Sequence, residues 1–126
     1  MVIGASAGAG SIAMQLIAYG GRNDKLFVGA VGESVFFPTQ SKVAELEVQF
    51  TDYANAAGCS TGDQLACLRS KDSATLQEAN SAFPYPGRPG NPIFPYSPCI
   101  DGDYIRDYPY KLFEQGKFIK VPIIFG

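Results

Sequence analysis

The stretch "VIGASAGAGS", residues 2–11, decides the fold, because an apolar start gives way there to a run of Gly, Ala and Ser. Residues 1–5 are typical of the end of a β-strand, and residues 8–19 are predicted to form a helix with Ile12, Leu16 and Tyr19 on one face. Two glycines at 20 and 21 end this helix, and "KLFVGAVGES" at 25–34 follows as a second buried strand. This order of strand, tight turn, helix and strand predicts a βαβ unit with parallel strands and a right-handed crossover.

Downstream of this unit the sequence predicts a helical excursion. Apolar residues recur at intervals of three and four between residues 39 and 57, which indicates an amphipathic helix ending at Gly58. These residues are Val43, Leu46, Phe50, Tyr53 and Ala57. Two shorter helices follow, one running through Leu68 and one to about Ala82. Their candidate N-caps are Ser60 or Thr61 for the first and Ser70 or Asp72 for the second.

The last part of the chain returns to the sheet. Six prolines between residues 84 and 98 exclude a helix or a central strand and predict a long irregular loop. An Asp-Gly turn at 101–102, a short helix at 108–115 ending before Gly116, and a final strand at 121–126 follow. The fold class is therefore α/β. Parallel sheets need both faces covered, so three strands predict the middle of a larger fold.

Composition excludes several classes of function. A chain of 126 residues with 46% hydrophobic and 17% charged residues is typical of at most one globular domain. The formal charge of −2 provides no basic face, so we expect no nucleic-acid partner. No apolar run is long enough to span a membrane. The chain contains no His, so any mechanism that uses an imidazole as a base needs a residue from elsewhere.

The small-residue turn has three possible interpretations. A P-loop is excluded because no Lys precedes Lys25. A dinucleotide-binding turn of the GxGxxA type fits Gly8, Gly10 and Ala13, with Glu33 about 20 residues on as a ribose-binding carboxylate. A nucleotide-binding or non-catalytic interaction module is therefore one alternative, and a plain structural turn is another.

The third interpretation is a nucleophile elbow, G-x-S-x-G, formed by Gly4, Ser6 and Gly8. A serine on a sharp strand-to-helix turn has strained backbone angles, and bulky neighbours two residues away on either side would collide with the adjoining strand and helix. Ser6 would then stand at the N-terminus of a helix, with the backbone N–H of Ala7 directed to where an oxyanion forms. A bare match of this motif is weak, and its place between a strand and a helix strengthens it.

Cysteine content leaves the redox state open. Cys59 and Cys67 flank the polar loop "STGDQLA", which is short enough for a disulfide to close, although two reduced thiols fit equally well. A disulfide would imply an oxidising compartment. The N-terminus has no basic flank, apolar region or cleavage site, so no secretion signal is predicted there.

Several segments together resemble the type B carboxylesterases and lipases of the α/β-hydrolase fold, in particular their fungal secreted members. The similar segments are "GASAGAGS", "LFVGAVGES", "GCSTGDQLACLRS", "PCIDGDYIRDYP" and "GKFIKVPIIFG". They stand in the family's order and cover nearly the whole chain. The resemblance implies that residues 1–126 are a partial type B domain, from the nucleophile elbow to the strand before the triad acid, with a helical insertion between the strands.

The resemblance also implies roles for individual residues. Ser6 would be the nucleophile, Ala7 one oxyanion donor, and Cys59 and Cys67 a disulfide pair. Cys99 matches no disulfide of the family, and we expect it to be a buried free thiol. Ser34 falls where the family places a serine that supports the triad carboxylate, although a capping or turn serine fits equally well. The Asp101–Gly102 pair is expected to be a turn rather than a catalytic pair. Aromatic residues of the proline loop could line a pocket or anchor the loop: Tyr85, Phe94 and Tyr96.

In the family the triad is Ser, Glu and His in that order. The resemblance places the Glu shortly after Gly126, the His further on, and the Gly-rich oxyanion loop before Met1. We therefore expect a secreted parent that hydrolyses small-molecule or lipid esters through an acyl-enzyme, without metal or cofactor. The 126 residues alone are expected to be inactive because they hold one triad residue of three.

Overall fold

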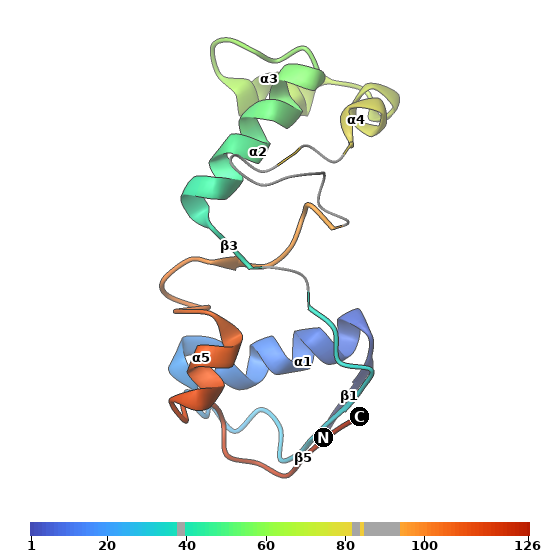
Figure 1. Cartoon of the computed structure of the whole chain (residues 1–126). Coiled ribbons are helices and arrows are strands. Elements are labelled where there is room, and N and C mark those ends of the chain that lie inside the picture. Colours follow the sequence, from blue (N-terminus) through green and yellow to red (C-terminus); the bar gives the residue numbers. More distant parts are fainter. Residues whose placement is uncertain (38–39, 82–83, 85–93) are drawn as a thin grey trace. The chain divides into compact units, whose positions relative to one another are not determined.

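The computed structural model of the chain describes residues 1–37, 40–81, 84 and 94–126 (Figure 1). They form two compact units. The first comprises residues 1–40 together with 98–126, and the second comprises residues 41–97. The candidate nucleophile belongs to the first unit.

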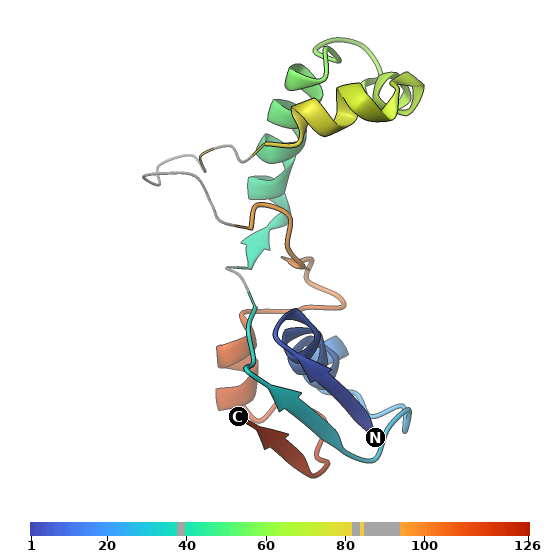
Figure 2. The same ribbon diagram turned by 90° about the vertical axis from the view of Figure 1, so that its right-hand side faces the viewer.

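A three-stranded parallel sheet is the centre of the first unit. Its strands are β1 (Val2–Ala5), β2 (Ala30–Glu33) and β5 (Ile123–Phe125), in the order β1-β2-β5. Figure 2 shows the three strands running in the same direction. The predicted βαβ unit and the return strand are therefore confirmed, and with them the α/β class.

Two helices contribute to the core of this unit. Helix α1 (Ala7–Ile17) packs on β1 and β2 and also contacts α5 (Pro109–Glu114). Apolar side chains at intervals of three and four bury one side of α1, as the periodicity predicted. Ile12 and Leu16 pack with Ala30 and Ile119, whereas Met14 and Ile17 pack with Ile105 and Leu112.

Turns at the helix ends follow the glycine signals. Helix α1 ends at Ile17, before the predicted Tyr19, and a short 3₁₀ turn, Ala18–Gly20, follows it. Tyr19 leaves the helical conformation with a φ of 52°, and Gly20 and Gly21 have φ values of 73° and 84°. Tyr19 is only half-buried, and its ring contacts the ring of Tyr104 edge-on at 5.2 Å.

After β4 (Cys99–Ile100), the Asp101 carboxylate accepts N–H groups of Asp103 and Ile105 at 3.0 and 2.9 Å. The predicted Asp-Gly turn is thus present.

The second strand is shorter than predicted. The buried strand expected over residues 25–34 is limited to Ala30–Glu33, and Leu26 and Val28 are 82% and 78% exposed. Lys25 has a φ of 58°, which interrupts an extended backbone. The apolar letters of "KLFV" therefore mark a loop before the strand rather than the strand itself.

Three helices form the second unit, together with the short strand β3 (Ser41–Lys42). They are α2 (Val43–Ala56), α3 (Gln64–Ser70) and α4 (Ser73–Ala79). Their core is built mostly from small residues, namely Ala54, Ala57, Cys59, Leu68 and Ala79. Gly58 has a φ of 73° and lies just after α2, as the sequence predicted.

The caps of the two short helices correct one prediction and confirm another. Asp63, not Ser60 or Thr61, caps α3, because its carboxylate accepts the N–H of Ala66 at 2.9 Å. Asp72 caps α4 by accepting the N–H of Thr75 at 2.8 Å. Ser70 instead ends α3, where its hydroxyl donates to the carbonyl of Cys67 at 2.7 Å.

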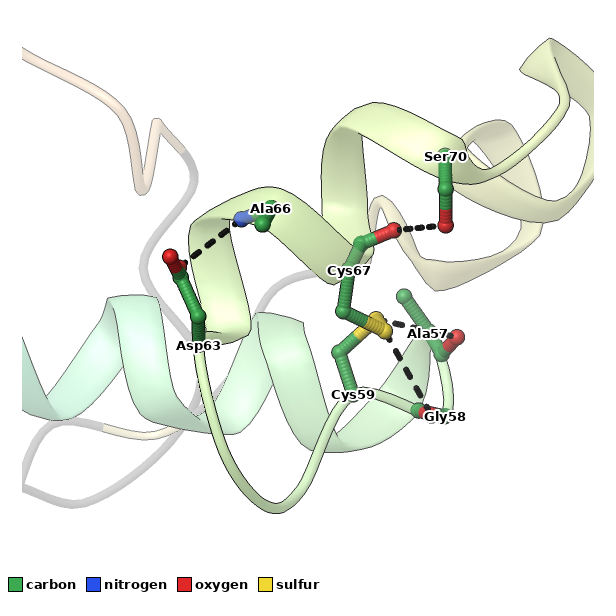
Figure 3. The surroundings of a disulfide bond; sticks show 7 residues. All are labelled: Ala57, Gly58, Cys59, Asp63, Ala66, Cys67 and Ser70. Atoms are coloured by element: carbon green, nitrogen blue, oxygen red, sulfur yellow. Dashed lines mark hydrogen bonds between the residues drawn. A yellow bond between two sulfur atoms is a disulfide. The ribbon is translucent and has the colours of Figure 1, made fainter.

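A disulfide joins Cys59, just after α2, to Cys67 in α3 (Figure 3). The bridge resolves the open question of these thiols in favour of the pairing that the family resemblance implied. Cys99 is a free thiol and is half-buried, so it is less enclosed than a core thiol.

Candidate active site

One residue, Ser6, makes the whole connection between β1 and α1. The strand ends at Ala5 and the helix begins at Ala7. The N–H of Ser6 donates to the carbonyl of Glu33 at 2.9 Å, and the carbonyl of Ser6 accepts the N–H of Gly10 at 3.0 Å. Ser6 is therefore tied to the neighbouring strand on one side and to the first turn of α1 on the other.

The backbone of Ser6 is strained and its side chain is exposed. Its φ and ψ are 51° and −116°, a conformation that a residue with a Cβ rarely adopts. Such strain costs about 1–3 kcal/mol and persists only where the surrounding structure enforces it. Here the enforcing contacts are the two hydrogen bonds that fix the bend. This sharp strand-to-helix turn at an exposed serine is the geometry that a nucleophile elbow requires.

The two glycines that flank Ser6 have different reasons to be small. A Cβ at Gly4 would lie 2.6 Å from the carbonyl carbon of Gly8, so only glycine fits below the bend. A Cβ at Gly8 would meet no described atom within 4 Å. The collision predicted on both sides of Ser6 is thus present at Gly4, whereas the contacts of the described residues do not require it at Gly8.

Ala7 lies where an oxyanion donor would be expected. As the first residue of α1, it carries one of the four N–H groups that have no partner within a helix. The positive end of the helix dipole also favours negative charge at this position. Ala7 is exposed, so a ligand can approach its N–H from solvent.

Ser34 follows β2 at the same edge of the sheet. It is exposed, has a φ of 50°, and its N–H donates to the carbonyl of Gly126 after β5. Since parallel strands bring their carboxyl ends together, Ser6 and Ser34 leave adjacent strands side by side. Ser34 therefore lies beside Ser6 at the carboxyl end of the sheet, and its role toward a carboxylate stays a prediction.

The structure contradicts the dinucleotide-binding interpretation, because no glycine-rich loop separates β1 from α1. Gly8, Gly10 and Ala13 all lie inside α1, and only Ser6 separates the helix from the strand. A pyrophosphate-binding turn requires glycines between the strand and the helix, where the backbone can approach the phosphates. Glu33 ends β2 as predicted, but no such turn faces it.

Phe94 and Tyr96, which were expected either to line a pocket or to anchor the proline loop, belong to the second unit. Tyr85 is outside the described residues, and Phe94 and Tyr96 are both 54% exposed. The Tyr96 ring contacts the Tyr53 ring edge-on at 6.4 Å. Partial burial, and to a smaller degree the charge of Tyr53, raises the pKa of Tyr96 above its usual value. The observed contact fits an anchoring role within this unit.

The described residues contain neither a cluster of metal ligands nor a membrane-spanning helix. Among the described residues, no three His, Cys, Asp or Glu side chains gather as a metal ion would require. In the same part of the chain, none of the helices combines the length and apolar character needed to cross a bilayer.

One contact near Ser6 was not predicted from the sequence. Gly10 is buried in α1, and the backbone carbonyl of Phe36 lies directly against it. The sequence offered Gly10 only as part of a dinucleotide motif. A glycine one helical turn after the candidate nucleophile was the available signal, but its partner could not be identified without the path of residues 34–37.

Comparisons with known proteins agree with this geometry. The model of the carboxylesterase family matches residues 1–126. Lipase 2 of Geotrichum candidum is 38% identical over the whole chain, which aligns with 24% of that protein, and a secreted lipase of Arthroderma benhamiae is 32% identical over 99% of the chain and 23% of its own length. The crystal structure of Aspergillus niger EstA is similar over 96% of this chain and 24% of its own, with a TM-score of 0.88 and 47% identity. The chain thus spans about a quarter of the length of these relatives.

Proposed function

Because this chain belongs to the carboxylesterase family, we propose that it carries the nucleophile of a serine ester hydrolase, and that Ser6 is that nucleophile. The single observation that supports this assignment is the strained, exposed position of Ser6 between β1 and α1. The family match supports the class of reaction, and the geometry of the bend supports the residue.

The proposed reaction is acyl transfer in two steps. The Ser6 Oγ attacks the ester carbonyl carbon while its proton passes to a general base, and the carbonyl π electrons move onto oxygen. The Ala7 N–H stabilises that oxyanion, and collapse of the intermediate expels the alcohol, which takes up the proton. Water then hydrolyses the acyl-enzyme. The chain has no His, so an imidazole base in this scheme comes from outside these residues.

Ser34 and the extent of the domain complete the proposed assignments. Ser34 supports the acidic member of the triad from the end of β2, beside Ser6, since both leave adjacent strands at the same edge. Residues 1–126 form the part of a type B domain that runs from the nucleophile elbow to the strand before the acid. No cofactor or metal has a step in this scheme.

The proposed substrates are small-molecule or lipid esters, and the proposed location is extracellular. Relatives named as lipases, one of them as a secreted lipase, support both statements. The Cys59–Cys67 disulfide also supports an oxidising compartment. The net charge of −2 gives no reason to expect a nucleic-acid partner.

A chimera tests the proposal. The segment of Geotrichum candidum Lipase 2 that aligns with this chain, 24% of that lipase, is replaced by the 126 residues. We expect the chimera to hydrolyse p-nitrophenyl butyrate. Ser6→Ala should lower its kcat by roughly 10⁴-fold or more, because loss of the nucleophile removes the acyl-enzyme route.

Ser60→Ala is the matched control, because Ser60 is another exposed serine but lies in the second unit. It should leave the rate of the chimera unchanged. The assignment of Ser6 is wrong if the Ser6→Ala chimera folds, as judged by circular dichroism, and keeps the activity of the parent chimera.

A further inference from the structure

Gly10 is in close contact with the chain that leaves β2. A Cβ built on Gly10 would overlap the carbonyl oxygen of Phe36 and would lie 2.9 Å from its carbonyl carbon. It would also lie 3.4 Å from the Cβ of Phe37. Because the closest atoms belong to the backbone, a side chain at residue 10 would force the whole segment to move rather than one rotamer.

The same segment begins at the candidate active site. Glu33 accepts the N–H of Ser6, and Ser34 follows it with a φ of 50° and its N–H directed to the carbonyl of Gly126. Gly10 itself donates its N–H to the carbonyl of Ser6. The chain from Glu33 to Phe36 therefore contacts the start of α1 at two points, at Ser6 just before the helix and at Gly10 within it.

We infer that Gly10 is a positioning residue, which allows the segment Ser34–Phe37 to lie against α1 and thereby holds Ser34 beside Ser6. Its importance for catalysis rests on the function proposed for Ser6 and Ser34, whereas the contact itself does not. Displacement of Phe36 would turn the chain at Ser34, since only one residue separates the two. Gly10 thus acts on the site through Ser34 without touching a substrate.

Gly8 provides a matched control in the same helix. Both glycines lie in α1, two residues apart, and both gain helix propensity when replaced by alanine. A Cβ at Gly8 meets no described atom within 4 Å, whereas a Cβ at Gly10 meets the Phe36 backbone. Any difference between the two alanine variants therefore reports the contact with Phe36 rather than helix propensity.

Amide hydrogen exchange of the 126-residue chain tests the inference. The N–H groups of Ser6 and Ser34 report the carboxyl end of the sheet, where they donate to Glu33 and Gly126. Those of Val2 and Ala30 report the opposite end, where they donate to Gly29 and Pro122 at 3.0 Å each. We expect Gly10→Ala to accelerate exchange at the first pair at least tenfold relative to the second pair, and Gly8→Ala to leave that ratio unchanged.

Two results would overturn the inference. Equal acceleration of all four amides in Gly10→Ala would mean that Gly10 serves only the stability of the unit, and no acceleration would mean that the segment does not depend on it. A measurement on the unaltered chain covers the case in which Gly10→Ala does not fold. There, a nuclear Overhauser effect between the Gly10 Hα and Phe37 Hβ protons is expected, and its absence contradicts the contact. Neither readout depends on ester hydrolysis. A failure of this inference can therefore be told apart from a failure of the proposed function of Ser6.

Discussion

Ser6 illustrates how a single strained residue can mark a site. A serine at φ 51° and ψ −116° loses stability relative to a glycine, which has no Cβ to clash. The residue is nevertheless exposed at the bend. The conformation that exposes Ser6 therefore lowers the stability of the fold.

Replacement of Ser6 by glycine measures that strain. We expect Ser6→Gly to have a free energy of unfolding about 1 kcal/mol higher than Ser6→Ala, because only the alanine retains a Cβ. Urea unfolding of the chain, followed through amide signals of residues 2–33, gives the two values. Equal stability of the two variants would show that the bend is not strained.

At the residue scale, the sequence predicted the position of Ser6 and the need for Gly4 because both depend on neighbours within the motif. The reason for Gly10 could not be predicted, since it depends on the path of Phe36, a residue 26 positions away. The prediction for Gly8 was wrong because it came from a general rule for the motif. That rule predicts a clash at Gly8, but a Cβ there meets no described atom within 4 Å.

At the scale of elements, we expect the disulfide to contribute to the stability of the second unit. Its fully buried core consists of three alanines with Cys59 and Leu68, and the larger side chains of Phe50, Tyr53 and Leu76 pack against it while only partly buried. The bridge closes a short loop between α2 and α3, with a sequence separation of 8. Closing such a loop restricts the unfolded chain and stabilises the folded one.

Reduction of the bridge is expected to destabilise this unit. For a loop of this length, the chain-entropy model gives a loss of about 2–3 kcal/mol in the free energy of unfolding. Urea unfolding with and without a phosphine reductant measures it. Cys67→Ala is the control, because it is already destabilised and should not respond to the reductant; an equal response of both chains would contradict the prediction.

Helix α4 should respond to acid through its cap. The N–H of Thr75 holds the pKa of Asp72 below its ordinary value of 3.8, with a smaller contribution from the Thr75 hydroxyl. A lowered pKa in the folded state means that the ionised carboxylate stabilises the helix above pH 3.8. That stability is lost as the pH falls below 3.8 toward the folded pKa.

An NMR titration of the Thr75 amide from about pH 6 to about pH 2 checks this behaviour. Protection of the Thr75 amide from hydrogen exchange should fall at the acid end of this pH range. In Asp72→Asn, whose amide oxygen still accepts the bond but does not titrate, protection should stay level. A parallel acid loss in both chains would place the titrating group elsewhere.

The elements themselves were largely predictable, because periodicity and glycine stops are local signals. Ile12 and Leu16 share a buried face, and Gly58 and Gly116 follow helices as expected. Prediction failed where local letters were ambiguous. The apolar segment "KLFV" lies outside β2. Asp63 caps α3, rather than Ser60 or Thr61, because Asp63 is the residue that directly precedes the helix.

At the scale of the whole molecule, the sheet of the first unit has one open face. Ile3, Val31 and Ile124 pair in register across β1, β2 and β5, and Ile3 and Ile124 are 72% and 68% exposed. Parallel sheets are normally covered on both faces. This row, together with the span of about a quarter of the relatives' length, agrees with the prediction of a partial α/β-hydrolase fold.

The 126 residues alone are expected to hydrolyse p-nitrophenyl butyrate at a negligible rate. Without an imidazole the Ser6 hydroxyl stays un-ionised, and incomplete triads keep at most roughly 10³–10⁴-fold catalysis over water. A spectrophotometric assay of the purified chain measures the rate. Rapid turnover that Ser6→Ala abolishes would show that these residues contain their own base.

Covalent trapping in the lipase chimera addresses the nucleophile itself. After reaction with a fluorophosphonate, peptide mapping by mass spectrometry should locate the phosphonyl group on Ser6 and on no other serine of the 126 residues. Ser34 is also exposed at a positive φ, but Ser6 lies at the bend between β1 and α1, where a nucleophile elbow places the reactive hydroxyl. An active chimera that carries the adduct on a different residue, or that stays unlabelled, would contradict the assignment of Ser6.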